Sequence, residues 1–369
     1  MAITKIDVEH FLILQHQMPL LDVRSSSEFQ YAQIPGAFSL PLFSDEERKV
    51  IGTLYKQEGK KRAIKEGLDY FGPKMRAMVS QVEKMVETWN EKLNADVSLN
   101  ENKKAPLNDI IEAPCIIIHC WRGGMRSGAV AWLLDLYGFQ VYQLIGGYKA
   151  YRNWALEQLQ KQYAFRILAG YTGSGKTNIL HSLKGNGETV LDLEMLASHK
   201  GSAFGGIGLP PQPSQEMFEN VLATALFNIG NQPCWVEDES QRIGQLHIPH
   251  TLWKTMRTKP VFFIEIPFGE RLQFIIEDYG KCDPQQMQQS IERIQKRLGP
   301  LETKTAIQHL RQGELEACFT ILLKYYDKYY LKGLTNRENL EGLLHKIPCC
   351  NVDSLINAEK LIACITANT

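Results

Sequence analysis

The sequence has no net charge, no long apolar run and no paired spacing of cysteines. Lysine plus arginine number 41 and aspartate plus glutamate number 41, so composition gives no sign of a dedicated nucleic-acid binder. Any such partner has to be argued from individual sites. The longest apolar runs, such as residues 261–266, are far too short to cross a bilayer, and we expect no membrane association.

The N-terminus and the cysteines indicate a compartment. The first residues carry Asp7 and Glu9 and have no small-residue cleavage site, so they do not predict a signal peptide. The eight cysteines show no spacing typical of a disulfide frame or a zinc site, and free thiols persist in a reducing cytosol. The sequence therefore predicts a cytoplasmic protein.

What the chain does contain is two stretches in which short apolar strands alternate with helices. Because 369 residues are many for one hydrophobic core, two domains are expected. The alternation predicts an α/β fold for both, and for the second a parallel sheet with helices on both faces. The predicted parts are a first domain over residues 1–150, with a helical segment at about 45–112 that ends in a polar loop from 91, a linking helix over 151–164, a second domain over 165–300 and a mostly helical C-terminal region over 301–369.

Cys120 follows the apolar strand 114–119 and precedes a predicted helix over 128–137. Backbone N–H groups at a helix start favour a thiolate, as do the nearby cations Arg122 and Arg126. The adjacent glycines let the loop curl so that its amides point inward and form an anion nest. We predict that Cys120 is a reactive nucleophile rather than a buried structural cysteine. The predicted anion cradle consists of Arg122, Gly123, Gly124, Arg126 and Ser127.

Two known signatures fit this loop. The string from His119 to Ser127 matches the H-C-x5-R-[S/T] pattern of cysteine phosphatases, in which a phosphate would occupy the same cradle. Upstream, three segments together resemble the opening of rhodanese domains, which carry sulfur or selenium on such a cysteine. The segments are Asp22-Val-Arg24, Glu28-Phe29 and Ile34-Pro-Gly-Ala37.

The rhodanese resemblance assigns structural roles to several of these residues. It implies that Asp22, Arg24 and Glu28 form ion pairs that hold the fold and take no part in catalysis. It also makes residues 45–112 an insertion, because a compact rhodanese unit is shorter than this first domain.

Residues 170–177 read Gly-Tyr-Thr-Gly-Ser-Gly-Lys-Thr and match the GxxxxGK[ST] phosphate-binding motif in full. They follow a predicted strand over 165–169 and precede a helix, which is the context that the motif requires. The amides of such a loop wrap phosphate oxygens, Lys176 neutralises their charge, and Thr177 can hold Mg²⁺. The motif leaves open whether ATP binds. The predicted phosphate-binding residues are Gly170, Gly173, Ser174, Gly175, Lys176 and Thr177.

Carboxylates at the ends of two predicted strands are candidates to hold metal or substrate. Glu237, Asp238 and Glu239 end one strand and resemble the metal-binding acid of P-loop proteins. Alternation along a strand would place Glu237 and Glu239 on one face and Asp238 on the other. Asp192 and Glu194 end another strand and are candidates to face substrate. Each of the five could equally be a solvated residue at a strand end.

The order of these segments resembles that in bacterial tRNA 2-selenouridine synthases. The fusion of the cysteine loop to the phosphate loop is specific to that family, and the likeness runs from about residue 10 to beyond 299. Residues beyond about 310 carry no pattern that we can interpret. The implied fold is a rhodanese-like α/β domain followed by a P-loop NTPase-like α/β domain. The segments that carry the likeness are 22–24, 120–127, 170–177, 192–194, 201–205 and 236–244.

This resemblance implies that selenium replaces the sulfur at C2 of the wobble 2-thiouridine in tRNA. Geranyl pyrophosphate would first alkylate the sulfur and turn a poor leaving group into a better one, while the phosphate loop holds the pyrophosphate with Mg²⁺. Selenophosphate is the implied selenium donor, and Cys120 would carry the selenium as a perselenide. The implied partners are tRNA and, as a further candidate, the enzyme that supplies selenophosphate.

Several alternatives stay open at this point. A basic cluster in the inserted segment could meet the phosphate backbone of tRNA, but interleaved acids make a solvated helix face equally good. A cysteine phosphatase or sulfurtransferase fused to a small-molecule kinase would also explain both loops. So would a regulatory protein that senses ligands without turnover. The basic cluster consists of Arg48, Lys49, Lys56, Lys60, Lys61 and Arg62.

Overall fold

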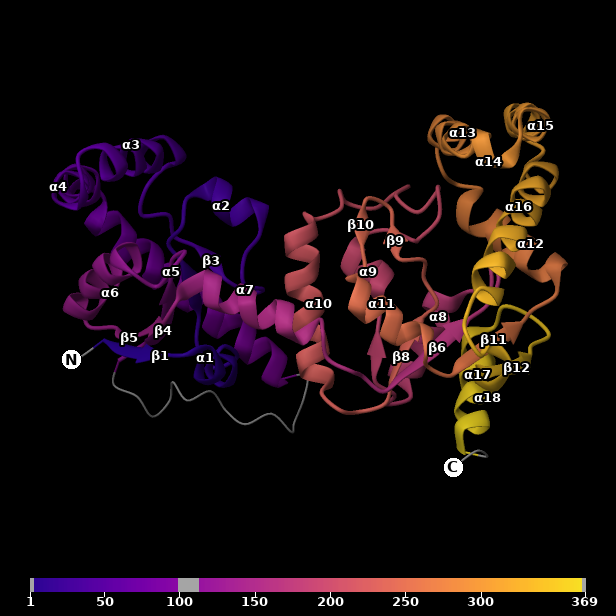
Figure 1. Ribbon diagram of the computed structural model, residues 1–369, viewed down its shortest axis with the longest axis horizontal. Coiled ribbons are helices and arrows are strands. Elements are labelled where there is room, and N and C mark those ends of the chain that lie inside the picture. The colour runs from indigo at the N-terminus through magenta and orange to yellow at the C-terminus, as the bar shows by residue number, and fades with distance from the viewer. Residues whose placement is uncertain (1–2, 99–112, 367–369) are drawn as a thin grey trace. The chain divides into compact units, whose positions relative to one another are not determined.

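The computed structural model describes residues 3–98 and 113–366. The chain divides into two compact units, Met1–Glu157 and Gln158–Thr369, coloured in Figure 1 from indigo to magenta and from magenta to yellow. Each unit contains a five-stranded sheet in which every pair of neighbouring strands is parallel. The α/β fold predicted for both parts and the parallel sheet predicted for the second are therefore confirmed, and the sheet of the first unit is parallel as well.

The sheet of the first unit has the strand order β1-β5-β4-β2-β3. Its central strand, β4, is buried along its whole length, which explains the uninterrupted apolar run that predicts it. The strands are β1 (Thr4–Ile6), β2 (Leu20–Asp22), β3 (Phe38–Ser39), β4 (Cys115–His119) and β5 (Gln140–Leu144). The helices outside the inserted segment are α1 (Val8–Leu14), α2 (Ser26–Tyr31), α6 (Met125–Tyr137) and α7 (Gly147–Gln158).

Over residues 45–98 the inserted segment is helical, as its apolar spacing predicts, and it contributes to the core of the first unit; its residues 99–112 lie outside the described part of the chain. Met78 and Val82 are buried in one cluster with Ile116 and Ile118 of β4. Over residues 91–98 the expected polar loop is replaced by a continuation of helix α5, because good helix formers follow and neither glycine nor proline interrupts them. The elements are α3 (Asp45–Gln57), α4 (Lys60–Phe71), the short η1 (Gly72–Lys74) and α5 (Met75–Ser98).

The sheet of the second unit has the order β12-β11-β6-β8-β7. Its outer strand β12 comes from the C-terminal region, where the sequence analysis expects mostly helices, and pairs with β11 along five residues. Only about half of β12 is apolar, as suits an edge strand, so its sequence gives no strand signal. The strands are β6 (Phe165–Ala169), β7 (Val190–Leu191), β8 (Cys234–Glu237), β11 (Val261–Glu265) and β12 (Leu344–Pro348), and a separate hairpin contains β9 (Arg242–Ile243) and β10 (Leu246–His247).

The helices of the second unit form two groups. Helices α8 and α18 contact each other and share a buried cluster with strands of the sheet. Helices α12 to α16 pack around a second cluster of their own, which includes the loop residue Phe204. None of the described helices is long and apolar enough to span a membrane. The helices are α8 (Lys176–Gly185), α9 (Leu193–Ala197), α10 (Gln215–Ile229), α11 (His250–Arg257), α12 (Phe268–Tyr279), α13 (Pro284–Arg293), α14 (Gln295–Leu298), α15 (Pro300–Gln312), α16 (Leu315–Thr335), α17 (Leu340–Leu343) and α18 (Ser354–Thr366).

Candidate active sites

Cys120 lies at the carboxyl end of β4, in a short loop that leads into α6. The loop passes very close to the end of β5. Gly123 has a φ of 59°, and a Cβ atom at this position would lie 2.3 Å from the carbonyl oxygen of Leu144. Only glycine permits this backbone conformation and this approach, so the predicted curl of the loop is present.

The sulfur of Cys120 is buried and accepts hydrogen bonds from the loop and from α6. The backbone N–H of Gly124 donates to Sγ at 3.4 Å, and the hydroxyl of Ser127 donates at 3.3 Å. Gln143 on β5 donates to the Ser127 hydroxyl at 2.8 Å and so fixes its position. Two residues of the predicted cradle, Gly124 and Ser127, therefore contact the sulfur directly.

These contacts favour the thiolate. Burial of the thiol opposes ionisation, but hydrogen bonds from the Ser127 side chain and from the backbone N–H groups of Ser127, Gly124 and Arg122 outweigh it. As a result, the pKa of Cys120 is held below its ordinary value. At Cys234, by contrast, burial raises the pKa of the thiol to about 12, and a hydrogen bond with the Leu191 backbone does not offset it.

The two arginines of the predicted cradle act differently from the expectation. Arg126 forms an ion pair with Glu28 at 2.8 Å, and Glu28 also pairs with Arg48 at 2.9 Å. The charge of Arg126 is thus directed at a carboxylate of α2. Arg122 offers its backbone N–H to the sulfur, while its side chain is exposed. Backbone and hydroxyl donors, not guanidinium groups, are the largest causes that favour the Cys120 thiolate.

A buried ion pair supports the strand ends beside Cys120. The Arg24 guanidinium donates to Oδ1 of Asp22 at 3.0 Å and to Oδ2 at 2.6 Å, and it lies 3.9 Å from the ring centre of Tyr148. Trp121 packs on the same tyrosine with ring centres 5.5 Å apart. Asp22, Arg24 and Glu28 are thus ion-pair residues, in agreement with the role that the rhodanese resemblance implies.

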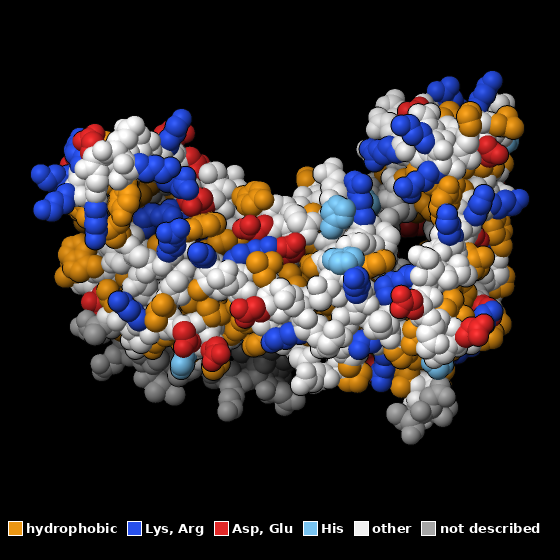
Figure 2. All heavy atoms as spheres, in the orientation of Figure 1, with side chains coloured by type: hydrophobic (Ala, Val, Ile, Leu, Met, Phe, Trp, Pro, Cys, Tyr) orange, Lys and Arg blue, Asp and Glu red, His pale blue; other side chains and the backbone are white. Residues whose placement is uncertain are grey.

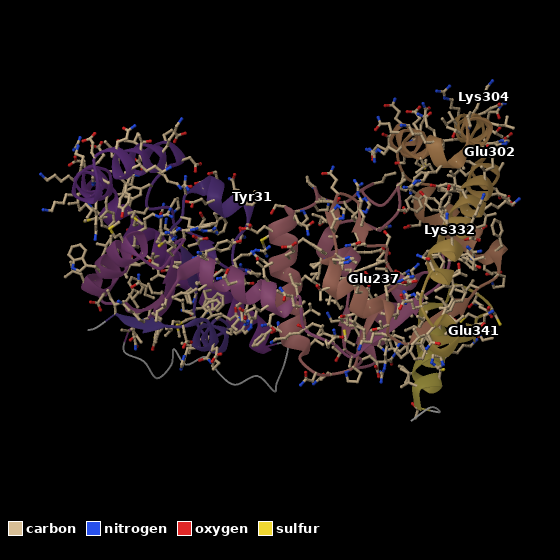
Figure 3. All side chains as sticks on the ribbon, in the orientation of Figure 1. Tyr31, Glu237, Glu302, Lys304, Lys332 and Glu341 are labelled. Atoms are coloured by element: carbon tan, nitrogen blue, oxygen red, sulfur yellow. The ribbon has the colours of Figure 1, made fainter. Side chains whose placement is uncertain are left out.

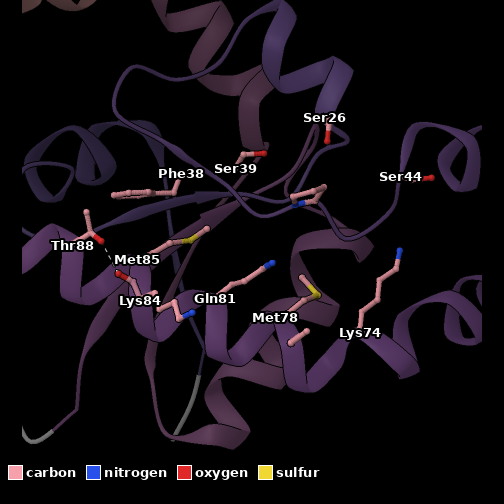
Figure 4. A pocket seen from close by; sticks show the side chains of 12 residues that line it. Ser26, Phe38, Ser39, Ser44, Lys74, Met78, Gln81, Lys84, Met85 and Thr88 are labelled. Atoms are coloured by element: carbon pink, nitrogen blue, oxygen red, sulfur yellow. Dashed lines mark hydrogen bonds between the residues drawn. The ribbon is translucent and has the colours of Figure 1, made fainter.

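A cavity of about 650 Å³ opens beside β3 in the same unit. Figure 4 shows the side chains of α5 facing those of the segment around β3 across this cavity. Cys120 does not line it, so this cavity is separate from the thiolate cradle. Its lining residues are Ser26, Phe38, Ser39, Pro41, Ser44, Lys74, Ala77, Met78, Gln81, Lys84, Met85 and Thr88.

The phosphate loop joins β6 to α8 in the second unit, in the strand–loop–helix context that the motif requires. Gly175 has a φ of 67° and caps the start of α8. Lys176 donates to the carbonyl of Gly170 at 3.0 Å, which folds its side chain back over the loop. The hydroxyl of Ser174 is buried without a hydrogen-bond partner among the described residues. A phosphate oxygen in the loop would supply the missing partner.

The candidate carboxylates separate into two groups. Strand β8 ends at Glu237, so the expected alternation does not extend to its successors, and Glu239 lines the phosphate-loop cavity whereas the buried Glu237 does not. Asp238 also lines the cavity, but it accepts a hydrogen bond from Tyr330 at 2.9 Å and pairs with Arg337. The expectation that Glu237 and Glu239 share a face is therefore not met.

Asp192 directly follows strand β7, whereas Glu194 lies in the first turn of α9 and not at the strand end that the sequence predicts. Asp192 caps α9 by accepting from the backbone N–H of Met195 at 2.7 Å, and it contacts His181 at 3.1 Å. Glu194 lines the cavity and accepts from the Thr177 hydroxyl at 2.8 Å. Of the candidate acids, Glu194 and Glu239 are therefore the ones left to face a metal or a substrate.

Burial, followed by the charge of neighbouring carboxylates, raises the pKa values of Glu194, Glu237 and Glu239. Burial and the nearby carboxylates of Asp192 and Glu194 raise the pKa of Glu237 to about 8. Burial likewise raises the pKa of Glu194 and of Glu239, although Lys176 opposes the shift in both. Figure 3 labels Glu237 beside the sheet of the second unit. A bound cation would favour the ionised form of these closely spaced carboxylates and would lower their pKa values.

The residues around Thr177 fit Mg²⁺ as part of a phosphate complex. The Thr177 hydroxyl and the carboxylates of Glu194 and Glu239 offer the oxygen ligands that Mg²⁺ prefers. Among the described residues, no group of three or more His, Cys, Asp or Glu could hold a metal ion. Phosphate oxygens of a bound substrate would therefore have to complete the coordination.

A wall of aromatic side chains faces the phosphate loop across a cavity of about 560 Å³. No sequence motif assigns a role to these residues. The one feature that could have indicated them is the Tyr-Tyr pair that occurs twice within 324–332, because this spacing places the rings on one side of α16. Tyr330 also donates to Asp238 and accepts from the Gly170 N–H at 3.1 Å, so it is fixed against the phosphate loop. The aromatic residues in the wall are Trp253, Phe274, Tyr279, Tyr325, Tyr326, Tyr329 and Tyr330.

Together the two sites define a class of protein, an α/β P-loop protein that also holds a cysteine whose surroundings favour the thiolate. Comparison with known proteins is more specific. Residues 163–342 match the family model described as the tRNA 2-selenouridine synthase AAA domain.

Relatives of this family match most of the chain. A tRNA 2-selenouridine synthase of Nitrosomonas europaea is 34% identical over 310 residues, which cover 82% of this chain and 73% of the relative. The match to the tRNA 2-selenouridine synthase of Bdellovibrio bacteriovorus is 32% identical and covers 88% of this chain and 91% of that relative. The match to the one of Marinobacter nauticus is 31% identical and covers 90% of this chain and 93% of that relative. The chain therefore belongs to the tRNA 2-selenouridine synthase family.

One solved structure is also similar in sequence. It is the N-terminal domain of a Clostridium difficile 630 protein described as ATP/GTP binding, with 35% identity over 42% of this chain and 99% of that chain. Its TM-score of 0.32 is too low to define a shared fold.

Proposed function

We propose that this protein replaces the sulfur at C2 of wobble 2-thiouridine in tRNA by selenium, in two steps that use its two sites in turn. The observation that carries the proposal is their combination in one chain. A hydrogen-bonded Cys120 thiolate suits group transfer through sulfur, and a phosphate loop that faces an aromatic wall suits a pyrophosphate with an apolar tail. Family membership supports the same reaction, and we place it in the cytoplasm.

The first step is S-geranylation at the phosphate loop. The C2 sulfur attacks the first carbon of geranyl pyrophosphate, the carbon–oxygen bond breaks, and pyrophosphate leaves. Lys176 and the loop amides stabilise the charge that develops on the leaving group. Mg²⁺ held by Thr177, Glu194 and Glu239 would add to this neutralisation. The Tyr330 ring lies 5.7 Å from the Lys176 Nζ, and an aromatic face at that point stabilises positive charge on the allylic carbon.

The second step is selenation at Cys120. Selenium derived from selenophosphate is carried as a perselenide, whose terminal anion takes the place of the thiolate among the donors from Gly124 and Ser127. The perselenide attacks C2, and geranylthiol leaves. Alkylation in the first step makes this departure easier, because a thioether leaves as a thiol whereas a thiocarbonyl sulfur does not.

Electron balance requires a small-molecule thiol in the cycle. Hydroselenide, released from selenophosphate by water, attacks the sulfur of a mixed disulfide between Cys120 and that thiol, which forms the perselenide and frees the thiol. After delivery to C2, the same thiol attacks the Cys120 sulfur, breaks the sulfur–selenium bond and releases 2-selenouridine. The mixed disulfide is thereby restored, and no net oxidation or reduction occurs.

The experiment that tests this proposal is nucleoside mass spectrometry of tRNA from cells with and without the protein, grown with selenium. We expect 2-selenouridine only where the protein is present. In a reconstituted mixture of thiolated tRNA, geranyl pyrophosphate and Mg²⁺, S-geranylated tRNA should form without ATP. A strict requirement for ATP hydrolysis in that mixture would favour the small-molecule kinase alternative.

A further inference from the structure

The C-terminal half of α16 presents two adjoining strips of side chains. Lys324, Lys328 and Lys332 are exposed and follow one another at intervals of four residues, so they lie in a row with steps of about 6 Å along the helix axis. Tyr325 and Tyr329 lie one residue later in the same spacing and line the phosphate-loop cavity. A row of cations therefore borders a row of rings at the edge of that cavity. Figure 3 labels Lys332 on this helix.

The three lysines have no counter-ion among the residues that the structure describes. Within the described residues, no carboxylate lies within ion-pair distance of any of the three, and the nearest acid in sequence, Asp327, pairs with Arg271 at 2.8 Å. In the basic cluster of the inserted segment, Arg62 pairs with Glu58 and Glu66, whereas no ion pair is found for the lysines of that cluster among the described residues. What distinguishes the lysines of α16 is that they border aromatic side chains at the edge of the phosphate-loop cavity.

The positive surface continues beyond α16. Exposed Arg297 lines the cavity and interacts with the Tyr325 side chain. Figure 2 shows Lys and Arg side chains gathered over α13 to α16. The rings of Tyr325 and Tyr329 lie 4.8 Å apart, and Tyr329 is 38% exposed, so a flat face is open to solvent at the mouth of the cavity.

We propose that this surface, made of Lys324, Lys328, Lys332, Arg297, Tyr325 and Tyr329, binds the single-stranded loop of an RNA and directs one unstacked base into the cavity. The inference rests on the proposed function and adds the place where the RNA docks. Lysines and arginine contact successive phosphates, and the tyrosines stack against the base. Interleaved cations and rings are the combination that single-stranded nucleic acid requires, whereas a protein partner would call for a drier, less charged face.

The position of this surface explains how a base of the RNA would reach the phosphate-loop cavity. The proposed alkylation brings the sulfur of a base to the carbon next to a pyrophosphate held in the loop, so the base has to leave its stack and enter the cavity. Tyr330 is fixed inside the cavity by Gly170 and Asp238, whereas Tyr329 stands at its exposed edge. The inner ring then faces the reacting carbon and the outer rings receive the base.

The first test measures RNA binding, with no turnover required. The probe is an anticodon stem–loop RNA, and its dissociation constant is followed by fluorescence anisotropy between 50 and 200 mM salt. The variant K324Q/K328Q/K332Q should bind at least about tenfold more weakly at physiological salt, and the slope of log affinity against log salt should fall by about two to three. A matched variant, K60Q/K61Q/K65Q on exposed α4, should bind like the wild type.

Two results would overturn the proposal. One is unchanged affinity and slope in the α16 variant, whatever the α4 variant does. The other is equal loss for the stem–loop and for a fully paired duplex of the same length, because that would make the surface a general polyanion site with no place for a loop. Circular dichroism melting curves verify that both variants are folded.

A second variant pair tests the stacking role. Tyr329→Ala should weaken binding of the stem–loop about fivefold or more, and Tyr329→Phe should retain the wild-type affinity because the ring is kept. A fluorescent base analogue at the wobble position should lose its quenching only in the alanine variant. Equal behaviour of the two variants would refute the stacking role. An RNA that binds as described but is never modified would contradict the proposed function and leave this docking site intact.

Discussion

The hydroxyl of Ser127 lies 3.3 Å from the sulfur of Cys120 and can donate its single hydrogen either to that sulfur or to the carbonyl of Gly124 at 3.2 Å. A hydrogen bond to a charged acceptor is the stronger of the two. Ionisation of Cys120 therefore turns the hydroxyl toward the sulfur, and Gln143, which donates to the same oxygen, keeps it in place.

Removal of this hydroxyl should make Cys120 a weaker acid. Ser127→Ala is expected to raise the pKa of Cys120 by about one to two units, since a hydrogen bond to a charged group contributes about 1.5 to 3 kcal/mol. The rate of iodoacetamide alkylation against pH measures this. Arg126→Ala is the matched comparison and should shift the midpoint less, because Glu28 already pairs with that arginine. A larger shift for Arg126→Ala would contradict the assignment.

Cys120→Ser should abolish selenium incorporation and spare the first step. A serine hydroxyl neither ionises at neutral pH nor forms a perselenide. We expect S-geranylated tRNA to accumulate, which nucleoside mass spectrometry detects. Cys115→Ser is a suitable control, because Cys115 lies at the opposite end of the same strand. Selenouridine made at the normal rate by the Cys120 variant would show that the cysteine has another role.

Lys176→Ala should have the complementary defect. Without the lysine, charge on the departing pyrophosphate is uncompensated, and loss of one such stabilising group typically lowers the rate by about 10²- to 10³-fold. Selenation of tRNA that is already S-geranylated should proceed, since that step uses the other site. Both activities are assayed separately with purified substrates. If the variant fails equally in both assays, the assignment of geranylation to the phosphate loop and of selenation to Cys120 is wrong.

Glu237 should make the second unit less stable as the pH rises. Its pKa is about 8 in the folded protein against 4.5 ordinarily, so across this window the folded protein retains a proton that the unfolded chain has released. Its contribution to the free energy of unfolding falls by at most about 5 kcal/mol, because a difference of one pKa unit corresponds to about 1.36 kcal/mol. Glu237→Gln is neutral throughout, and its stability relative to wild type should increase from pH 5 to pH 8.

Urea unfolding at several pH values measures this difference. Exposed Glu270→Gln serves as the control and should track the wild type at every pH. Parallel curves for wild type and Glu237→Gln would mean that Glu237 is ionised in the folded protein.

Local signals in the sequence were sufficient to predict both loops. A buried strand that runs into glycine and a helix predicts Cys120 at a strand end, and the phosphate motif predicts the loop that ends at Thr177. What sequence could not supply is pairing across long separations. The contact between Arg126 and Glu28 spans 98 residues and decides that the guanidinium serves a carboxylate. The Tyr330 contact with Gly170 spans 160 residues and brings the aromatic wall to the loop.

Strand alternation failed at Glu239 for a related reason. The rule holds only while the strand continues, and β8 ends at Glu237. Where the strand would end depends on the neighbouring strands of the sheet, which the local sequence does not specify. Likewise, β12 is a strand because β11 lies beside it, and its own residues carry little preference.

The position of β12 has a consequence for how the protein is made. Residues 344–348 are synthesised after the other strands of the sheet that carries the phosphate loop, yet they form an outer strand of it, and α18 then packs against α8 directly after that loop. Until synthesis reaches residue 344, the first unit can fold while the sheet of the second still lacks this outer strand. A premature stop codon shortly before residue 344 would thus be expected to damage the pyrophosphate site itself, although every residue of the motif would have been translated.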